Sequence, residues 1–290
     1  MAGIATNRTN ITLPAEVSAA ILQKTQEQSA IMQLARQIPL PGRGAAIPVI
    51  TGDPQAAWVD ETDAKPVSNP SLATKIMRGY KLAVIVPFSD EFRRDAASLY
   101  DAIVARLPLA LAAKFDATVF GPASGAPGSD FDALGAAAAQ SLSTDAYAGL
   151  VAAQAAIATA GGIMDGIALS PQGQSVLLAA VDGDRRPLFI NSVADGPVPR
   201  ILGARTVLSK GAYVAGNPAS SNTVGVAGDW TQAVWGTVEG VQIRFADQTG
   251  LTIGGQQVNL WEHNMFAVRA EIEVGFRADV SAFNLLTVTP

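Results

Sequence analysis

The first forty residues pass from a polar segment to one with apolar positions at helical spacing. Residues 1–13 are polar and lack periodicity, which predicts an extended arm that becomes ordered only when something binds it. Pro14 suits the first turn of a helix. A partial apolar stripe follows it at Val17, Ile21, Ile31 and Leu34. We therefore expect helix as far as Ile38, with a break at the polar run 26–29.

Two apolar, β-branched segments flank a polar excursion. Residues 45–51 and 75–88 predict strands, and the second contains the apolar run 82–86. Residues 52–71 lie between them and carry several charges and three prolines, so this stretch cannot build a core of its own. We expect the flanking strands to pair as a long hairpin with a polar tip. Such a hairpin becomes buried only by lying across a neighbouring subunit.

The best helical pattern of the chain comes next. Apolar residues recur on one face at four-residue steps: Leu99, Ile103, Leu107, Leu111 and Phe115. Ser98 is the expected N-cap, and a helix running to Phe120 would be about 33 Å long. Pro108 interrupts the hydrogen-bond ladder of this helix, so we expect a kink or a restart there. Residues 121–128 are rich in Gly, Pro, Ala and Ser, which predicts a loop and a domain boundary.

Helix and strand signals alternate from residue 130 to residue 244. We expect a helix over 145–159, a strand over 163–169, and a second helix over 170–181 that begins at Ser170-Pro171. Further strands are expected at 188–192, 205–208, 233–238 and 241–245. A last strand over 258–274 should return to the first domain, which would make that domain discontinuous in sequence. Together these elements predict an α+β fold.

Composition and charge narrow the class of protein. The 290 residues are 49% hydrophobic and 16% charged, which is typical of a chain with a large core. A net charge of -5 argues against binding to a phosphate backbone as the main task. Because the chain contains no cysteine, disulfides, zinc-thiolate sites and cysteine nucleophiles are excluded. Asn7, Arg8 and Asn10 do not fit a secretory signal, and the most apolar stretch, 149–164, is too short to cross a membrane.

The sequence contains few of the residues and motifs that enzymes use for catalysis. His263 is the only histidine available as a base, no G-x-S-x-G motif occurs, and neither phosphate-binding glycine motif is present. We interpret His263 as a structural or interface residue. The acidic residues of the 52–71 excursion lack the spacing of a calcium loop, and Asp182-Gly183-Asp184 reads as a turn. We expect no enzyme activity, no cofactor and no metal.

Several motifs, in this order along the chain, resemble those of the major capsid proteins of tailed bacteriophages, the family with the Hong Kong 97-like fold. The motifs are Ala57-Trp58-Val59-Asp60-Glu61 with Lys65-Pro66, Val86-Pro87-Phe88-Ser89-Asp90-Glu91 before the long helix, Gly228-Asp229-Trp230, Asn264-Met265 and Arg269-Ala270-Glu271. The resemblance implies an N-terminal arm, an extended E-loop hairpin, a peripheral domain with a long spine helix, and a mixed α/β axial domain. The expected divisions are 1–38 for the arm and helix, 39–88 for the E-loop and its strands, 89–121 for the spine helix, 122–245 for the axial domain and 246–290 for the returning strands.

This resemblance implies a structural subunit that self-assembles into the icosahedral shell around the DNA genome of a tailed phage. The expected partners are copies of the chain itself in pentamers and hexamers, with portal and decoration proteins, and the DNA is enclosed without sequence-specific binding. Because the chain begins at its arm, we expect either a separate scaffolding protein or prior trimming. Assembly is expected in the bacterial host cytoplasm, and the product is the virion. The alternatives are an encapsulin-like nanocompartment and an oligomeric binding protein or enzyme of similar appearance.

The resemblance also implies candidate contact residues. Trp58, Glu61 and Lys65 of the E-loop and the pair Arg93-Arg94 are candidates for contacts between subunits. Some members of the family form an isopeptide bond between an E-loop lysine and an asparagine, and the matching residues here are Lys65 and Asn264, with Glu271 as the proton acceptor. A lysine becomes nucleophilic only when its pKa is lowered by desolvation. We therefore favour the alternative, in which Lys65 pairs with a carboxylate of a neighbouring subunit.

Overall fold

One sheet of the molecule is organised around a single long strand. The computed structural model describes residues 25, 29–52, 58–59, 71–91, 106–192, 196–197, 200–216 and 221–289. The five strands of this sheet are β1 (Arg36–Pro39), β4 (Tyr80–Ser89), β12 (Ala233–Thr237), β13 (Gln242–Ala246) and β16 (Met265–Ala278). β16 pairs with β4 along one side, and on its other side with β13 in its first half and β12 in its second. β1 extends the sheet by pairing in parallel with β12.

Buried and partly exposed side chains alternate along β16, which explains why this strand lies in the middle of the sheet. Its even-numbered side chains from Phe266 to Phe276 are buried, whereas Arg269, Glu271 and Glu273 on the other face are only partly covered. This period of two is the pattern of a strand with one face on a core. The strand begins at Met265, so the expected strand over 258–274 is wrong at its start. Asn264 takes a left-handed backbone conformation with a φ of 52°, which ends the preceding turn and prevents one continuous strand.

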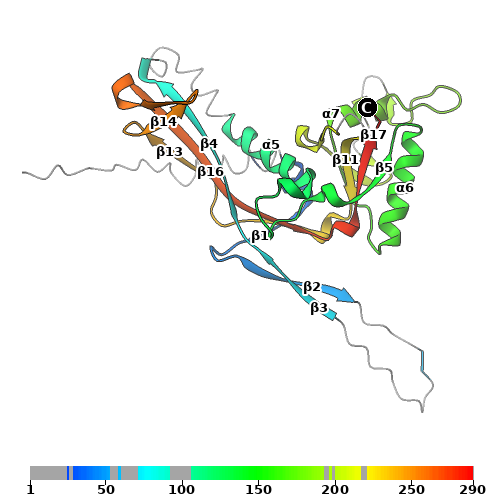
Figure 1. Ribbon diagram of the computed structural model, residues 1–290. Helices are drawn as coiled ribbons and strands as arrows, with labels where there is room; N and C mark the ends of the chain where they lie inside the picture. Colours follow the sequence, from blue (N-terminus) through cyan, green and yellow to red (C-terminus); the bar gives the residue numbers. More distant parts are fainter. Residues whose placement is uncertain are drawn as a thin grey trace, which may run out of the picture.

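The second sheet has six strands and is covered by helices. They are β5 (Ala138–Ser141), β6 (Gly166–Leu169), β9 (Arg200–Ile201), β10 (Ala204–Leu208), β11 (Asn222–Gly228) and β17 (Phe283–Val288), in the order β5-β17-β11-β6-β10-β9. Side chains alternate across it: Ile167, Leu169 and Leu286 pack beneath α6 (Ala146–Thr159) and α7 (Pro171–Leu178). Ala168, Val226 and Leu285 join the other core, which includes α5 (Leu107–Phe120). The mixture of helices and strands confirms the expected α+β class (Figure 1).

Three two-stranded hairpins and several short turns complete the described elements. The hairpins are β2 (Ala45–Gly52) with β3 (Ser71–Met77), β7 (Ile190–Ser192) with β8 (Gly196–Pro197), and β14 (Gly250–Ile253) with β15 (Gln256–Asn259). The single 3₁₀ turns are η1 (Ala123–Gly125), η2 (Leu134–Ala136), η3 (Lys210–Ala212), η4 (Trp230–Gln232), η5 (Trp261–His263) and η6 (Val280–Ala282). No helix among the described residues is long and apolar enough to cross a membrane.

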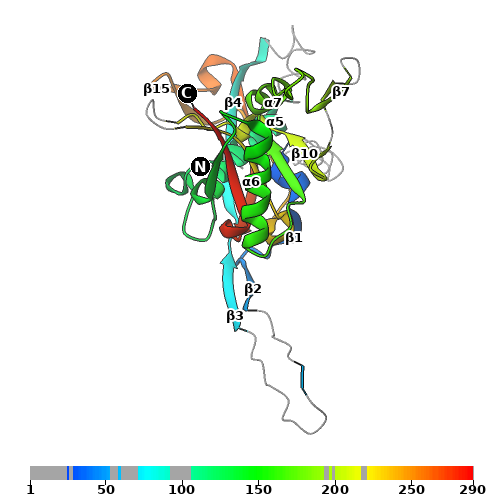
Figure 2. The same cartoon turned by 90° about the vertical axis from the view of Figure 1, so that its right-hand side faces the viewer.

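The β2–β3 hairpin projects away from both sheets (Figures 1 and 2). Its pairing, from Ala45 with Met77 to Gly52 with Ser71, confirms the expected hairpin. The expected strand over 75–88 is in fact two strands, because β3 pairs with β2 whereas β4 pairs with β16. A small apolar cluster of Leu40, Met77 and Val234 fixes the base of the hairpin to the five-stranded sheet.

Three of the described helices begin directly after a residue whose side chain caps them. The Ser29 hydroxyl accepts a hydrogen bond from the Met32 N–H at the start of α2 (Ala30–Leu34), in agreement with the expected break before it. The helix does not reach Ile38, because Arg36–Pro39 pair with β12 as β1. α5 begins at Leu107 with Pro108 in its first turn, and the earlier part of the expected helix, residues 92–105, lies outside the described residues. Asp145 and Ser170 cap α6 and α7, and α7 ends at Leu178, three residues before the expected end.

Each of the two sheets contains strands from both of the expected segments, 122–245 and 246–290. β12 and all of β13 except Ala246 fall in the expected axial segment, yet both strands lie in the five-stranded sheet with β16. β17 lies in the six-stranded sheet between β5 and β11, although it belongs to the last segment of the chain. The physical reason is that the chain passes between the sheets three times, between β4 and β5, at η4 and at η6, so that each sheet takes strands from separate parts of the chain.

A buried carboxylate ties α2 to α5. The Asp116 side chain, on α5, is fully buried and accepts hydrogen bonds from Ser29 Oγ at 2.5 Å, from the Ala30 N–H at 2.9 Å and from Ser209 Oγ at 2.6 Å. Burial raises the pKa of this carboxyl above its usual range, while the hydrogen bonds from Ser209 and Ser29 act in the opposite direction. Asp116 therefore joins three segments that are far apart in the sequence.

Five charged residues, which we call the junction network, hold the base of the hairpin. They are Lys75, Arg78, Asp130, Asp132 and Arg277. Arg277 Nη1 and Nη2 lie 2.8 Å from Asp132 and 3.1 Å from Asp130, and its Nε donates to the Ile76 carbonyl of β3 at 2.8 Å. Only 11% of the Arg277 side chain is exposed, and its guanidinium contacts both carboxylates of the network.

Replacing Asp116 by alanine should lower the free energy of unfolding by about 3 kcal/mol, because buried hydroxyl and N–H donors lose their acceptor. Ser209→Ala, which removes one donor, should cost only about 1 kcal/mol. Because the pKa of Asp116 is raised on folding, its protonated form favours the folded state. The deficit of Asp116→Ala should therefore be largest below about pH 3.8, the usual value, and should shrink as the pH rises through the folded-state pKa. Urea unfolding between pH 3.5 and 7 measures this, and a deficit that grows with pH would contradict it.

Arg277→Ala should lower the free energy of unfolding by roughly 3 kcal/mol, since it leaves two partly buried carboxylates without their main partner. Lys75→Ala is the matched control from the same network. Its side chain is 40% exposed, and its removal should cost no more than about 1 kcal/mol. The midpoint of urea unfolding measures both variants. Equal losses would show that Arg277 has no special place in the network.

Candidate functional site

Trp58 is the one E-loop contact candidate among the described residues. Its indole is fully exposed, at 104% of the reference value, and Val59 beside it is also exposed. A large aromatic side chain without cover is typical of a residue that packs against a partner. Glu61, Lys65, Arg93 and Arg94 lie outside the described residues, so their contacts stay predictions.

Asn264 and Glu271 are not brought together within one molecule. Asn264 precedes β16 and is exposed, and its carbonyl accepts a hydrogen bond from the Asp90 N–H at 2.9 Å. Glu271 lies seven residues further along, which corresponds to about 23 Å of extended strand. Its carboxylate lies 3.3 Å from Arg269 Nε. If these two residues act on one lysine, they belong to different copies of the chain.

The remaining residues considered for chemistry have structural surroundings. The exposed His263 ring lies with Nδ1 2.9 Å from the Asn259 carbonyl oxygen, within the turn that leads to β16. Asp182 accepts hydrogen bonds from the N–H groups of Asp184 and Arg186, which makes this segment a turn closed by its own side chain. Among the described residues, no three acidic or histidine side chains lie close enough together to hold a metal ion.

The Gly228-Asp229-Trp230 motif forms the contact between the two sheets. The Trp230 ring is buried against Phe120 and Phe283, and its Nε1 donates to the Gly166 carbonyl at 3.0 Å. Asp229 caps η4 by accepting from the Thr231 N–H, and also accepts from the Ile163 N–H at 3.1 Å. A side chain at Gly228 would overlap the Phe283 ring. The motif therefore packs the two sheets against each other.

A neighbouring carboxyl completes this contact. Asp165 accepts a hydrogen bond from the Trp230 N–H at 2.8 Å. Partial burial raises the pKa of Asp165, and the nearby charge of Asp229 acts in the same direction.

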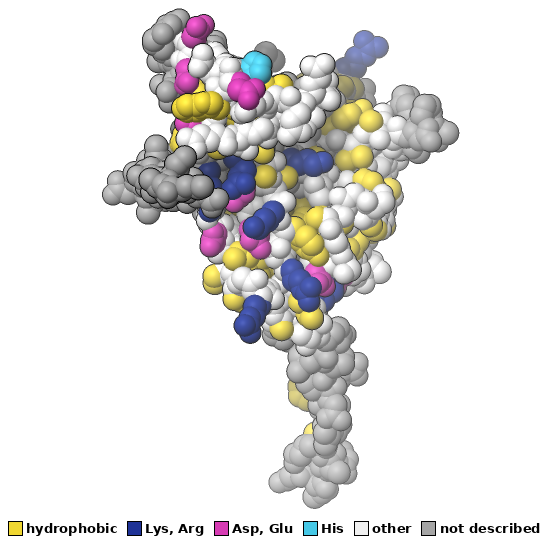
Figure 3. Space-filling model, turned by 60° about the vertical axis from the view of Figure 1, so that its left-hand side comes forward, with side chains coloured by type: hydrophobic (Ala, Val, Ile, Leu, Met, Phe, Trp, Pro, Cys, Tyr) yellow, Lys and Arg dark blue, Asp and Glu magenta, His cyan; other side chains and the backbone are white. Residues whose placement is uncertain are grey.

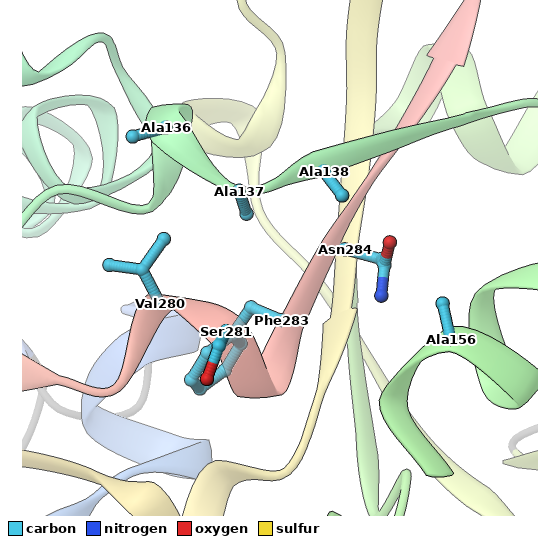
Figure 4. A pocket seen from close by; sticks show the side chains of 8 residues that line it. All are labelled: Ala136, Ala137, Ala138, Ala156, Val280, Ser281, Phe283 and Asn284. Atoms are coloured by element: carbon cyan, nitrogen blue, oxygen red, sulfur yellow. The ribbon is translucent and has the colours of Figure 1, made fainter. Parts of the chain in front are cut away.

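One hollow was not foreseen from the sequence. It has a volume of about 350 Å³ and is lined by residues of η2, β5, α6, η6 and β17, namely Ala136, Ala137, Ala138, Ala156, Val280, Ser281, Phe283 and Asn284 (Figure 4). The Asn284 side-chain oxygen is buried there without a hydrogen-bond partner. No sequence signal identified this residue, because the strand that carries it was not predicted.

On one face of the molecule the charged side chains do not form a single basic or acidic field (Figure 3). On the face shown in Figure 3, basic and acidic side chains lie interspersed, with apolar ones scattered between them. This distribution agrees with the argument from net charge that a phosphate backbone is not gripped.

Known proteins align with this chain over nearly its full length. Residues 9–288 match the sequence model described as the Phage capsid family. The chain is 32% identical to the probable major capsid protein gp17 of Mycobacterium phage L5, and the alignment covers 91% of this chain and 85% of that protein. It is 25% identical to the major capsid protein of Staphylococcus phage 80alpha, with 94% of this chain and 83% of that protein covered.

Solved structures share the fold. A chain from Gordonia phage Cozz superposes with a TM-score of 0.73 at 23% identity, covering 91% of this chain and 87% of that one. A chain from the capsid of the native GTA particle, computed with C5 symmetry, gives a TM-score of 0.61 at 15% identity and covers 92% and 91%. These findings confirm the resemblance expected from the motifs of the hairpin, of η4 and of β16. The chain belongs to the phage capsid family.

Proposed function

We propose that this chain is the major capsid protein of a tailed bacteriophage, and that copies of it form the icosahedral shell enclosing the DNA genome. The observation that carries this function is the family match over residues 9–288, together with a 32% identical relative that is itself a probable major capsid protein. The role is structural and not enzymatic. The protein is part of the virion.

The projecting β2–β3 hairpin is suited to a contact between neighbouring subunits. The β2–β3 hairpin extends beyond the two sheets, and its base is fixed by the junction network and by the cluster around Met77. A hairpin that is rigid at its base can carry the exposed Trp58 onto a neighbouring subunit. Glu61, Lys65, Arg93 and Arg94 are the further residues that we assign to such contacts.

The finer organisation follows from this function. Pentamers and hexamers of the chain would close the shell, with a portal, decoration proteins and a scaffolding protein as further partners. Assembly would take place in the cytoplasm of the bacterial host. The net charge of -5 suits an inner wall that does not hold the packaged DNA by specific contacts.

Production of the chain in bacteria should yield assemblies of many copies, because the contacts between copies reside in the chain itself, and addition of a scaffolding protein should close these assemblies into shells. Negative-stain electron microscopy of the purified protein measures this. Shells that contain nucleic acid support a capsid, whereas shells that enclose a specific enzyme would favour the encapsulin-like alternative. A stable monomer with a measurable affinity for a small ligand would contradict both.

Lys65 provides a second test, because an ion pair and an isopeptide bond differ under denaturation. If Lys65 pairs with a carboxylate, shells boiled in SDS should give a single band at 29.9 kDa. If its amine instead attacks the side-chain amide of Asn264 on another copy, an amide bond forms, ammonia leaves, and a ladder of multimers appears.

The matched variant for this test is Lys65→Arg. It keeps the charge but cannot form the bond, since a guanidinium stays protonated. Under the ion-pair interpretation this variant should assemble and run as the wild type does. A ladder that disappears in Lys65→Arg would establish the cross-link.

A further inference from the structure

One stretch of the chain carries positive charge alone. Residues 196–228 contain three charged side chains, all of them basic, although the whole chain has a net charge of -5. These residues, which we call the basic strip, are Arg200 on β9, Arg205 on β10 and Lys210 at the start of η3. All three are exposed. Because no acidic residue lies in this stretch, the strip forms a local region of positive charge.

The fold holds two of these charges directly opposite each other. β9 and β10 pair as a tight hairpin, in which Arg200 and Arg205 are cross-strand partners. The two residues of its turn, Leu202 and Gly203, both have left-handed backbone conformations, with φ of 50° and 84°, as in a type I′ turn. The Cα atoms of such partners lie about 5 Å apart, and like charges placed opposite each other destabilise a sheet. An anion that binds both guanidinium groups would remove this repulsion.

Carboxylates of the protein do not neutralise the strip. Among the described residues, none of its three side chains forms an ion pair, and Arg205 Nη2 donates instead to the neutral side chain of Gln33 at 3.3 Å. Asp116, which is bonded to the cap of η3, is fully buried. Asp165, which precedes β6, directs its carboxyl to the Trp230 N–H. The strip therefore has no counter-charge within the described part of the molecule.

The exposure of the strip determines which kind of anion it can hold. A small anion gains little from three exposed cations, because water and salt screen them. A polymer gains more, since double-stranded DNA carries one negative charge per about 1.7 Å of helix axis, and several cations then act on one molecule. Arginine suits this ligand because its planar guanidinium binds phosphate oxygens through two parallel hydrogen bonds. The strip is therefore suited to a phosphate backbone.

We propose that the basic strip binds the phosphate backbone of double-stranded DNA, without reading its sequence because phosphate contacts carry no sequence information. The proposal rests on the proposed function, in which many copies enclose a DNA genome, and it places the strip on the inner side of the shell. Three cations on an acidic chain bind DNA weakly. DNA is favoured over an acidic protein segment because the strip repeats once per copy, so that one long polyanion gathers many weak contacts.

Binding of a short fluorescent duplex to dissociated subunits tests the proposal. Arg200→Gln/Arg205→Gln removes the opposed pair. Arg185→Gln/Arg186→Gln is the matched control, because it removes the same charge from an exposed arginine pair that has Asp184 beside it. Fluorescence anisotropy measures the dissociation constant over a series of salt concentrations, and circular dichroism checks that both variants are folded. Polyglutamate, used as a competitor in the same assay, represents an acidic protein segment.

We expect the wild type to bind duplexes of different sequence equally, and the Arg200→Gln/Arg205→Gln variant to bind about tenfold more weakly at low salt. The slope of log Kd against log salt concentration should fall by about two, because each lost phosphate contact accounts for roughly 0.9. The control should keep the affinity and the slope of the wild type. Equal losses in the two variants would overturn the proposal, since the effect would then be one of net charge.

A wild type that does not bind the duplex would also overturn the proposal. So would polyglutamate that binds as tightly as the duplex, which would assign the strip to an acidic protein. Assembly is measured separately, by negative-stain microscopy of the wild type. Particles that form from a chain without affinity for DNA would refute this inference alone, whereas a wild type that stays monomeric would refute the proposed function.

Discussion

The packing of Trp230 between the two sheets is the interaction on which the rest of the subunit depends. Its ring contacts Phe120 at the end of α5 and Phe283 at the start of β17, and its Nε1 is bonded to Gly166 at the start of β6. The chain crosses between the sheets on both sides of this contact, at η4 before β12 and at η6 before β17. Because strands are exchanged at these crossings, neither sheet can form completely without the other.

Two polar clusters attach the outlying parts of the chain to this centre. Asp116 fixes α2 and Ser209, the residue that caps η3, to α5 through hydrogen bonds. The junction network fixes the projecting hairpin to β16 and to the loop before β5. Buried polar groups fix the orientation of the segments that they join as well as stabilising them, since their hydrogen bonds are satisfied in one arrangement only. The hairpin therefore leaves the body of the subunit at a defined place.

The surface of the subunit carries an exposed residue that is available for contacts with other subunits. The exposed Trp58, in the segment between β2 and β3, suits a contact with a neighbouring subunit under the function proposed above. Interface area summed over many weak contacts can close such a shell without any single strong bond.

The sequence by itself determined the local elements and the family. The caps at Ser29, Asp145 and Ser170 and the place of Pro108 in the first turn of α5 follow from preferences of neighbouring residues, which can be read from a single sequence. The motifs around Trp58 and Trp230 pointed to the correct family, although the physical role of Trp230 was visible only in the fold. The contacts of Glu61, Lys65, Arg93 and Arg94 stay predictions.

Tertiary structure decided which strands share a sheet. β17 is buried on both faces, and β11 contains two glycines, so neither shows the alternation that identifies a strand from sequence. The partners of β4, β12 and β13 lie up to nearly two hundred residues away, and local periodicity carries no information about such distant pairing. For the same reason the sequence did not reveal the buried Asp116, the Arg277 network or the unpaired Asn284, because each owes its character to neighbours that only folding brings close.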